Sequence, residues 1–289
     1  MKKSFQGLPS FSLIKKDGVT LLLKNRFKDL LIRLGIEDWK TFLQRNLPNT
    51  TFFKGRTPHP SIPIREGMRI IIRQYSHGGL FRGLTQNLFF FGSRSFQELV
   101  LMEEVRACGI PTVEPIGAIH QYVPPFFYRS YLLTLEIPQA VDLIEYFRRI
   151  GNRPSPENLS QKRQVIRSVA ILIRQFHQEG FFHGDLQLKN ILLSGEQALL
   201  IDFDRSYRKQ PLSLKERMKN LLRFNRSIEK WRRLGLPITK TDCWRLFKAY
   251  SENDPKIQRA IEKVVRTYSL RLFLYRLVWA VEGWVARIL

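Results

Sequence analysis

The sequence predicts an α+β fold, in which a small β-rich part with one main helix precedes a larger, mainly helical part. The first part is predicted from β-branched or apolar runs bounded by turn residues, which are typical of strands and occur at residues 18–24, 68–75 and 131–137. The second part is predicted from a long amphipathic segment that opens at Ser160 and closes at Gly180, and from the helical pattern after Leu212. Strands are therefore expected early in the chain and helices late.

The β-rich part is expected to include an N-terminal extension. Residues 1–49 form this extension, which we expect to pack on or near the small lobe, with a basic helix at residues 26–34 after its strand. Residues 50–137 form the small lobe itself. Its main helix is predicted over residues 93–108, where apolar residues recur at helical spacing and Gly109 ends the pattern.

The larger lobe is predicted to span residues 138–289, with a basic segment at 205–240 and a C-terminal helix. Proline-containing segments at 54–63 and 152–156 are expected to be loops between larger units.

Composition limits the class of protein but does not identify its ligand. A chain of 289 residues with 44% hydrophobic content can bury one large core or two packed lobes, which excludes disorder for most of its length. The formal charge of +23 favours anionic partners, such as nucleic acid, an acidic membrane or a phosphorylated substrate. The two cysteines, Cys108 and Cys243, suggest neither a disulfide framework nor a cysteine-based zinc site, and they fit a reducing cytosol.

Neither end of the sequence is expected to cross a membrane. The basic start has only a short, interrupted apolar run, so no signal peptide is predicted. The last stretch, LRLFLYRLVWAVEGWVARIL, falls short of a spanning helix, but its Trp279 and Trp284 alternate with arginines as in a helix that lies on an anionic leaflet. A buried helix of the large lobe explains the same pattern equally well.

The segment FFHGDLQLKNILLSGEQALLIDFDRS, residues 181–206, carries the most informative pattern of polar side chains. Strands at 191–193 and 198–201, joined by Ser-Gly-Glu, are predicted to form a hairpin. This hairpin would bring Asp185 and Asn190, before its first strand, close to Asp202 at the end of its second strand. Phosphoryl transfer requires such a set, because a carboxylate accepts the proton of the attacking hydroxyl and oxygen ligands hold magnesium against the nucleotide phosphates.

The spacing also matches the protein-kinase signature. HGDLQLKN, residues 183–190, meets the H-R-D-L-x-x-x-N pattern at every position but the Arg, and Asp-Phe-Asp at 202–204 meets D-F-G except at its last residue. His183 is expected to be a structural loop residue rather than a base. Lys189 could meet the transferring phosphate, although a single Lys on a loop is more often solvated.

A nucleotide-binding half of the site is expected in the small lobe. Kinases anchor the ATP phosphates with a strand Lys paired to a helix Glu; here the strand offers Arg73 and the following helix offers Glu98. Arg keeps the charge but is not equivalent to Lys. A phosphate-covering loop is poorly matched, with Gly55 as its candidate, and backbone groups near Glu136 and Ile137 are predicted to receive adenine.

Taken together, these stretches resemble the lipopolysaccharide kinase family. The resemblance covers about residues 54–235 and is carried by IIIRQYSHGGL, SRSFQELVLMEEVRACGIPTVEPIGA, LLTLEIPQAVDL, FFHGDLQLKNILL, LIDFDRS and NLLRFNRSIEKWRRL. It implies a bilobal, protein-kinase-like fold that uses ATP and Mg²⁺ to phosphorylate a sugar hydroxyl, of 3-deoxy-D-manno-octulosonic acid (Kdo) or heptose, in the lipopolysaccharide inner core. It assigns Asp185 as the base, Asn190 and Asp202 as magnesium ligands, and Arg73 with Glu98 as the phosphate-anchoring pair.

Two features suit an acidic glycolipid acceptor, Kdo-lipid A or heptose-containing core, better than a peptide. Gly184 replaces the Arg that would pair with a phosphorylated activation loop, so that charge switch is not expected. The segment 205–240 holds twelve Lys and Arg against Glu216 and Glu229. A cationic surface there would favour a phosphorylated, carboxylated ligand. We therefore expect a cytoplasmic protein attached peripherally to the anionic cytosolic face of the Gram-negative inner membrane.

Other functions remain open at this stage. A nucleic-acid-binding protein would explain the charge, but no nucleic-acid motif is apparent, so no nucleic acid partner is expected. A kinase-like phosphotransferase acting on another small molecule or on a protein would explain the Asp185 site but not the basic segment. A catalytically weak ATP-binding module is kept open by Arg73 and by the poor glycine loop.

Overall fold

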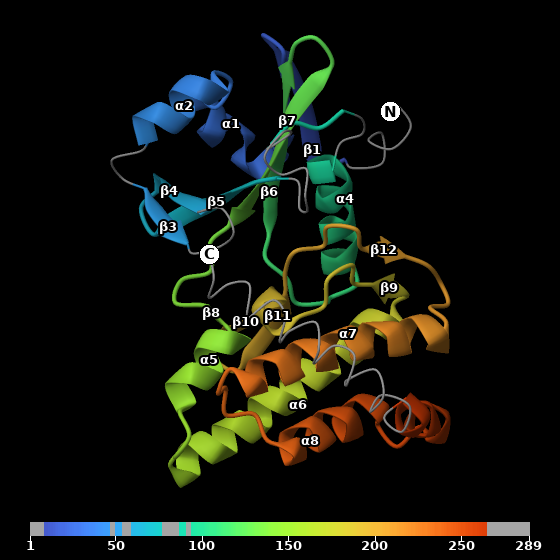
Figure 1. Ribbon diagram of the computed structural model, residues 1–289. Helices are drawn as coiled ribbons and strands as arrows, with labels where there is room; N and C mark the ends of the chain where they lie inside the picture. The colour runs from blue at the N-terminus through green and yellow to red at the C-terminus, as the bar shows by residue number, and fades with distance from the viewer. Residues whose placement is uncertain (1–8, 47–49, 54–58, 77–86, 91–93, 265–289) are drawn as a thin grey trace, which may run out of the picture. The chain divides into compact units, whose positions relative to one another are not determined.

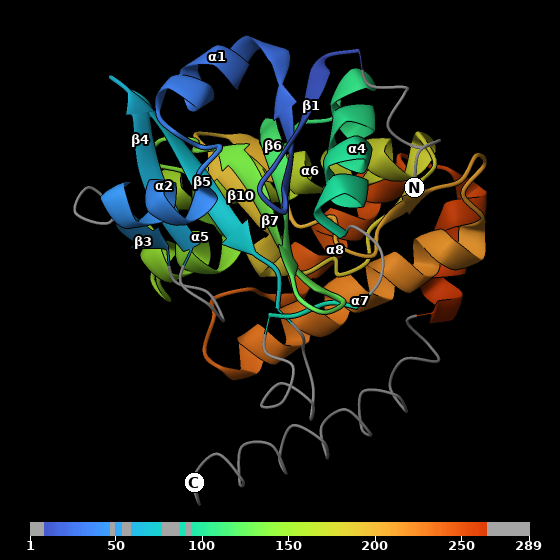
Figure 2. The same ribbon diagram turned by 90° about the horizontal axis from the view of Figure 1, so that it is seen from above.

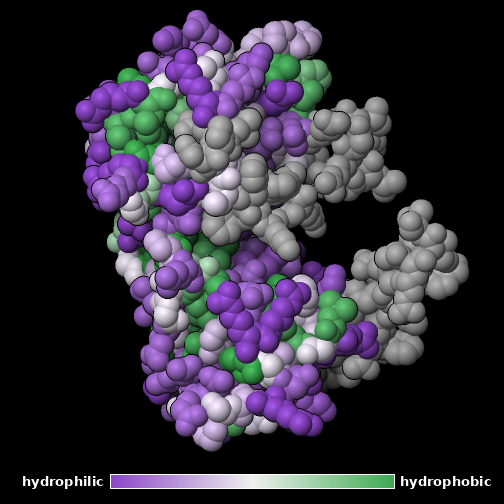
Figure 3. Space-filling view, turned by 90° about the vertical axis from the view of Figure 1, so that its left-hand side faces the viewer, coloured by the Kyte–Doolittle hydropathy of each residue, from purple (hydrophilic) through white to green (hydrophobic). Residues whose placement is uncertain are grey.

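The computed structural model describes residues 9–46, 50–53, 59–76, 87–90 and 94–264. The chain divides into two compact units, residues 1–138 and 139–289. On the face shown in Figure 3, hydrophilic residues predominate and hydrophobic surface is gathered in a few places. Among the described residues, no helix has the length and apolar character needed to cross a membrane.

The first unit is built on a seven-stranded antiparallel sheet with the strand order β1-β2-β6-β7-β5-β4-β3. Its strands are β1 (Phe11–Lys16), β2 (Val19–Lys24), β3 (Thr51–Phe53), β4 (His59–Arg65), β5 (Met68–Gln74), β6 (Pro115–Val123) and β7 (Phe127–Leu135). Its helices are α1 (Asn25–Arg33), α2 (Trp39–Asn46) and α4 (Arg94–Ala107). The predicted strands at 18–24 and 68–75 and the predicted helices at 26–34 and 93–108 therefore match β2, β5, α1 and α4 to within one residue at each end.

Helices cover both faces of this sheet (Figures 1 and 2). Ile70 and Ile72 of β5 belong to one hydrophobic cluster with Phe27 of α1 and Trp39 of α2. Because successive side chains of a strand point to opposite faces, Arg73 lies on the other face, where it pairs with α4. The apolar face of β5 thus fixes the strand, and its polar face carries a candidate site residue.

One expected loop is a strand. Residues 54–63 were predicted to be a loop because of their prolines, but β4 begins at His59, and Ile62 and Ile64 are buried on the sheet. Pro63 is tolerated because the pairing of β4 with β5 is irregular between Pro63 and Arg65, where the ladder does not need its missing N–H. Strand β7 also begins four residues earlier than predicted, at Phe127.

The second unit is mainly helical, with α5 (Leu143–Ile150), α6 (Pro156–Gln178), α7 (Leu214–Arg233) and α8 (Lys240–Ser251). Its short strands are β8 (Val141–Asp142), β9 (Phe181–Phe182), β10 (Ile191–Ser194), β11 (Gln197–Leu200) and β12 (Tyr207–Arg208), which form a sheet in the order β11-β10-β8 and the pair β12-β9. The predicted hairpin is β10 and β11, paired from Ile191↔Leu200 to Ser194↔Gln197.

Helix α6 forms the centre of this unit and packs against α8 (Figure 1). It begins at Pro156, four residues before the predicted start at Ser160. The reason is local, since the Ser155 hydroxyl accepts a hydrogen bond from the Asn158 N–H at 3.2 Å and proline is favoured in the first turn. Its predicted apolar side is fully buried and consists of Val165, Val169, Leu172, Ile173 and Phe176.

Candidate functional site

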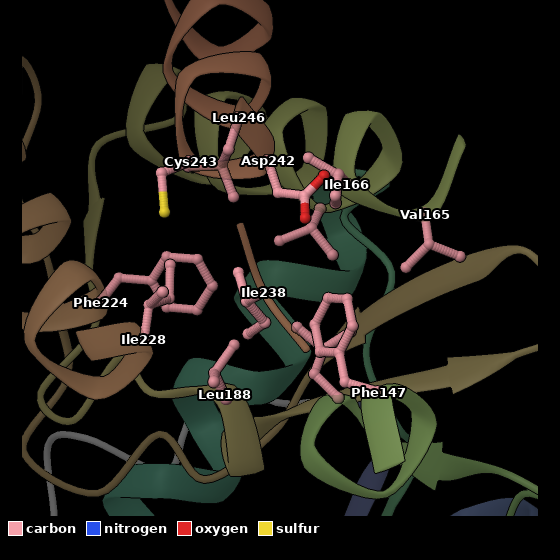
Figure 4. Close-up of a pocket in the computed structure, with 12 residues that line it drawn as sticks. Phe147, Val165, Ile166, Leu188, Phe224, Ile228, Ile238, Asp242, Cys243 and Leu246 are labelled. Carbon is pink, nitrogen blue, oxygen red and sulfur yellow. The ribbon is translucent and has the colours of Figure 1, made fainter. Parts of the chain in front are cut away.

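The loop that carries Asp185 is anchored to the helical core by its own apolar side chains. It leaves β9 at Phe182 and passes through a short 3₁₀ turn, Leu188–Asn190, into β10. Leu186 and Leu188 are both buried. Figure 4 shows Leu188 beside Phe224 and Ile228 of α7, in a small apolar pocket of the helical core. Burial of alternate residues thus fixes the loop while the intervening polar side chains remain accessible.

The hairpin brings Asp185, Asn190 and Asp202 together, as its spacing predicts. One step beyond the register of β10 and β11, the Ile201 N–H donates to the Asn190 carbonyl at 3.1 Å, so Asp202 follows a residue bonded directly to Asn190. The Asn190 Nδ2 donates to the Asp185 carbonyl at 2.7 Å. Asp202 has a φ of +65°, a left-handed conformation that costs energy for residues with a side chain and recurs at functional sites.

The Asp185 carboxylate lies in a cationic environment. Its Oδ1 accepts hydrogen bonds from Arg223 Nη1 at 2.7 Å and from Gln187 Nε2 at 2.5 Å. Lys189 Nζ lies 4.0 Å from Oδ2. Asp185 and Arg223 are both half-buried, so the carboxylate is oriented and still accessible. In the sequence, Arg223 is only one charge of the basic segment, because nothing in the motif connects it to a residue 38 positions earlier.

His183 has a structural position beneath this loop. Its ring is buried, its Nδ1 accepts the Asp185 N–H at 3.1 Å, and its Nε2 therefore donates to the Ile201 carbonyl at 3.1 Å. Burial lowers the pKa of His183 below its ordinary value, which favours the neutral ring. The imidazole thus connects the backbone of Asp185 to the residue that precedes Asp202, and it has no nitrogen left to act as a base.

Helix α7 supports the same loop with two buried polar side chains. Asn220 accepts the His183 N–H and donates to the His183 carbonyl, both at 2.9 Å. Ser227 accepts the Leu188 N–H at 3.2 Å. These residues were missed in the sequence, although a signal exists: two polar residues seven positions apart lie on the otherwise apolar stripe of a helix.

A second layer of hydrogen bonds holds Asn220 in place. Its Oδ1 also accepts from the Nε2 of His177 at 3.1 Å, and the His177 Nδ1 accepts from the Tyr250 hydroxyl at 2.7 Å. Burial lowers the pKa of His177 to about 3, so this ring is neutral as the network requires.

Glycine at position 184 has a steric cause. A Cβ there would lie 2.3 Å from the Asp204 carbonyl oxygen and 2.7 Å from the Arg205 carbonyl carbon. The Gly184 N–H in turn donates to the Ser206 hydroxyl at 2.9 Å. The segment after Asp202 therefore packs directly on the loop backbone, which leaves no room for the arginine of the protein-kinase pattern.

The first unit pairs Arg73 with Glu98. Glu98 lies on α4, is 3% exposed, and accepts hydrogen bonds from the Arg73 guanidinium and from the Tyr75 hydroxyl. The guanidinium also stacks 4.6 Å from the centre of the Tyr75 ring. The two predicted residues are thus brought together, and Tyr75, which occurs in the sequence analysis only within the stretch IIIRQYSHGGL, is a third member of the cluster.

The other residues predicted to bind the nucleotide are only partly described. Gly55 lies outside the described residues, as does the C-terminal stretch with Trp279 and Trp284. Glu136 follows β7, and its N–H donates to the Arg69 carbonyl at 2.9 Å, so that N–H is not available to adenine. Its side chain pairs with Arg69 at 3.4 Å. The Glu136 carbonyl and the backbone of Ile137 remain the predicted adenine-binding groups.

The oxygen atoms near Asp185 fit a magnesium ion. The Asn190 Nδ2 donates to the Asp185 carbonyl, which leaves Oδ1 as the candidate atom for binding a metal ion, and the Asp202 carboxylate follows the bonded backbone pair. Magnesium in kinases takes one or two protein side chains and completes its octahedron with water and substrate phosphates. The described residues contain no cluster of three or more His, Cys, Asp and Glu that could hold a metal ion.

Comparison with known proteins identifies the family. The model of the lipopolysaccharide kinase (Kdo/WaaP) family matches residues 64–250. A 3-deoxy-D-manno-octulosonic acid kinase of Vibrio vulnificus is 30% identical over 166 residues, which are 56% of this chain and 65% of the relative, just under two thirds of its length. A second, of Actinobacillus succinogenes, is 30% identical over 193 residues, 64% of this chain and 76% of that protein.

A solved structure, described as WaaP in complex with acyl carrier protein, superposes with a TM-score of 0.56 at 18% identity, covering 89% of this chain and 96% of that one. This likeness confirms the predicted protein-kinase-like fold. The family match over residues 64–250, more than half of the chain, shows that the chain belongs to the lipopolysaccharide kinase family.

Proposed function

We propose that this protein is an ATP- and Mg²⁺-dependent kinase that phosphorylates a sugar hydroxyl, of Kdo or heptose, in the lipopolysaccharide inner core. The observation that carries the proposal is the backbone-linked set of Asp185, Asn190 and Asp202, with an oriented and accessible Asp185 carboxylate. Family membership adds the class of acceptor, because relatives over much of the chain are named Kdo kinases.

In this mechanism Asp185 is the base. Arg223 and Gln187 both donate to its Oδ1, so Oδ2 is the oxygen that receives the proton of the attacking sugar hydroxyl. Lys189, 4.0 Å from Oδ2, supplies positive charge where the transferred phosphoryl group would arrive. Magnesium, when bound by Asn190 and Asp202, would neutralise charge on the nucleotide phosphates.

The cluster in the first unit would anchor the nucleotide phosphates. Glu98 is buried and holds the Arg73 guanidinium in one orientation, and Tyr75 fixes Glu98 in turn. A guanidinium presents several donors in a rigid fork, so it can bind Glu98 and a phosphate oxygen at once. Arg73 would therefore take the role of the usual kinase lysine.

The basic segment 205–240 would bind the acceptor. Its twelve cations exceed its two carboxylates by ten, and one carboxylate, Glu216, is already used within the segment by Ser213, Tyr207 and Lys209. Phosphate and carboxylate groups on an inner-core glycolipid would complement the remaining positive charge. Because such an acceptor is lipid-linked, the protein would act as a peripheral protein on the cytosolic face of the Gram-negative inner membrane.

The test is phosphate transfer by the purified full-length chain. ATP and Mg²⁺ are supplied with Kdo-lipid A precursor or, in parallel, with heptose-containing core, and mass spectrometry detects the added phosphate. We expect transfer to one acceptor and a loss of about a thousandfold in Asp185→Asn, since an amide cannot accept the proton. Glu196→Gln, an exposed carboxylate in the turn of the same hairpin, is the matched control and should keep full activity.

Two results would contradict the proposal. One is undiminished transfer by a folded Asp185→Asn protein, which would exclude Asp185 as the base. The other is a wild-type protein that binds ATP but phosphorylates neither acceptor, which would point to a different acceptor or to an ATP-binding module.

A further inference from the structure

The end of the β6–β7 hairpin lies just beyond the β1–β2 turn, where the Tyr122 N–H still donates to the Gly18 carbonyl, 2.8 Å away. The last residue of β6 that pairs with β2 is Gln121, opposite Val19, whereas pairing with β7 continues to Val123↔Phe127. Residues 124–126 then form the turn, and Figure 1 shows the hairpin projecting past α1 and α2 of its own unit. Its end is therefore not covered by the core of the sheet.

This projecting end carries large aromatic side chains on the surface. Phe126 is 68% exposed, Tyr122 is 50% exposed, and Phe90, from the segment bridged to β7, is 52% exposed. The Phe90 ring lies 6.5 Å from that of Phe126 and 5.4 Å from that of Phe127, so the rings form one cluster. We call Phe90 and residues 122–127 the hairpin tip. Contiguous exposed apolar side chains, unlike single scattered ones, are a feature of binding surfaces.

Basic residues lie beside the hairpin tip. Lys16, Val19, Gln121 and Arg129 are successive cross-strand partners on β1, β2, β6 and β7, so their side chains form one row on one face of the sheet. Lys15 lies one position back on the other face. Both lysines and Arg129 are exposed. The acidic residues near Lys16 are Asp17 in the β1–β2 turn, Glu37 at 3.9 Å and Asp38. Lys15 and Arg129 form no ion pair with a described residue, so these two cations beside the rings are available to an anionic surface.

We propose that the hairpin tip docks on an anionic lipid bilayer. Aromatic rings placed at the end of a projecting hairpin, with cations set back from them, match the layering of a membrane interface, where rings enter the headgroup region and cations meet acidic lipid. Figure 3 shows hydrophobic surface next to strongly hydrophilic residues at the upper margin of the first unit. The inference rests on the proposed function in one respect: contact with the bilayer would bring the protein to its lipid-linked acceptor.

Vesicle binding tests this surface without requiring catalysis. The full-length protein is sedimented with vesicles of phosphatidylcholine, with or without phosphatidylglycerol. We expect binding to the anionic vesicles, weakened about tenfold or more in Phe90→Ser/Phe126→Ser because two rings no longer leave water. Arg129→Gln and Lys15→Gln should each weaken it roughly fivefold, and more at low salt than at high salt.

A matched control distinguishes vesicle binding through the hairpin tip from nonspecific binding through any exposed apolar surface. Leu234 and Trp244 in the second unit are 64% and 62% exposed, so Leu234→Ser/Trp244→Ser removes a similar amount of exposed apolar surface elsewhere. This control should bind vesicles within twofold of wild type, roughly the scatter between unrelated surface variants. Equal losses of vesicle binding in both double variants, or a wild-type protein that does not bind anionic vesicles, would overturn the proposal.

A second measurement distinguishes this inference from the proposed function. With a deacylated, soluble acceptor, Phe90→Ser/Phe126→Ser should transfer phosphate at the wild-type rate, while its rate on bilayer-embedded acceptor falls with binding. If no acceptor is phosphorylated but vesicle binding still depends on the tip, the kinase proposal fails and the docking surface stands.

Discussion

The two units place their candidate groups by different means. In the first unit, Glu98 is buried and its position depends on two side chains, Arg73 and Tyr75, that donate to it directly. In the second unit, Asp185 is half-buried, and its loop is positioned through backbone hydrogen bonds to His183 and Asn220. The buried Glu98 cluster is therefore expected to contribute to the stability of the first unit, whereas the half-buried Asp185 carboxylate is expected to tolerate substitution without unfolding of the loop that carries it.

Removing one arginine from each unit should give the largest difference in the free energy of unfolding. Arg73→Met leaves the Glu98 charge buried without its cation, so we expect a loss of about 3–5 kcal/mol in the free energy of unfolding. Arg223→Met breaks an Arg–carboxylate contact in a half-exposed site, and should cost less than about 1 kcal/mol. Chemical denaturation of both variants measures the difference.

Of the same two variants, the one that loses less stability, Arg223→Met, should show a specific loss of activity. Arg223→Met stays folded but should lower kcat for phosphate transfer about tenfold, because Asp185 loses the donor that orients it. Arg163→Met, an exposed cation on α6 outside the basic segment, is the control for the loss of one positive charge. Arg73→Lys should restore most of the stability lost in Arg73→Met. Equal destabilisation by Arg73→Met and Arg223→Met would refute the comparison.

A pair of tyrosine variants sharpens the comparison at smaller scale. Tyr75 and Tyr207 both donate a hydroxyl hydrogen to a glutamate, but Tyr75 is buried and Tyr207 is exposed. Tyr75→Phe should lower the free energy of unfolding by about 1.5–3 kcal/mol, since a bond to a buried charge is lost. Tyr207→Phe should change it by less than about 0.5 kcal/mol. Thermal unfolding of the two variants provides the measurement, and similar shifts would mean that burial of Glu98 does not matter.

Sequence reasoning succeeded where contacts are local in the chain. The spacing of HGDLQLKN and Asp-Phe-Asp was enough to predict that Asp185, Asn190 and Asp202 lie close together, because one short hairpin connects them. The buried side of α6 was likewise predicted residue by residue from its helical period. The start of α6 was missed because Ser155 and Pro156 were taken for a loop, although they are a good helix cap.

Contacts between distant segments could not be predicted in the same way. Arg223, Asn220 and Ser227 reach the loop only because α7 docks beneath it, and their contacts span 37–39 residues of sequence. A polar residue on an apolar stripe indicates that a partner exists, but not which backbone group it meets. The space that excludes a side chain at Gly184 is made by residues 204 and 205, so it too appears only in the folded chain.

The smallest expected effect is the pH dependence of stability that arises from His177, the buried hydrogen-bond partner of Asn220 in the second unit. His177 has a folded pKa of about 3 against an ordinary value of 6.5, so the unfolded chain binds its proton more tightly and stability falls as pH drops below 6.5. Between pH 7 and pH 5.5 this residue alone should cost about 1 kcal/mol of the free energy of unfolding, a window in which carboxylates stay ionised. His177→Gln, which can still donate to Asn220, should reduce the pH dependence by that amount whatever its own stability. Denaturant unfolding at the two pH values measures the dependence of stability on pH, and an unchanged dependence in His177→Gln would show that this imidazole is not held neutral behind the loop that carries Asp185.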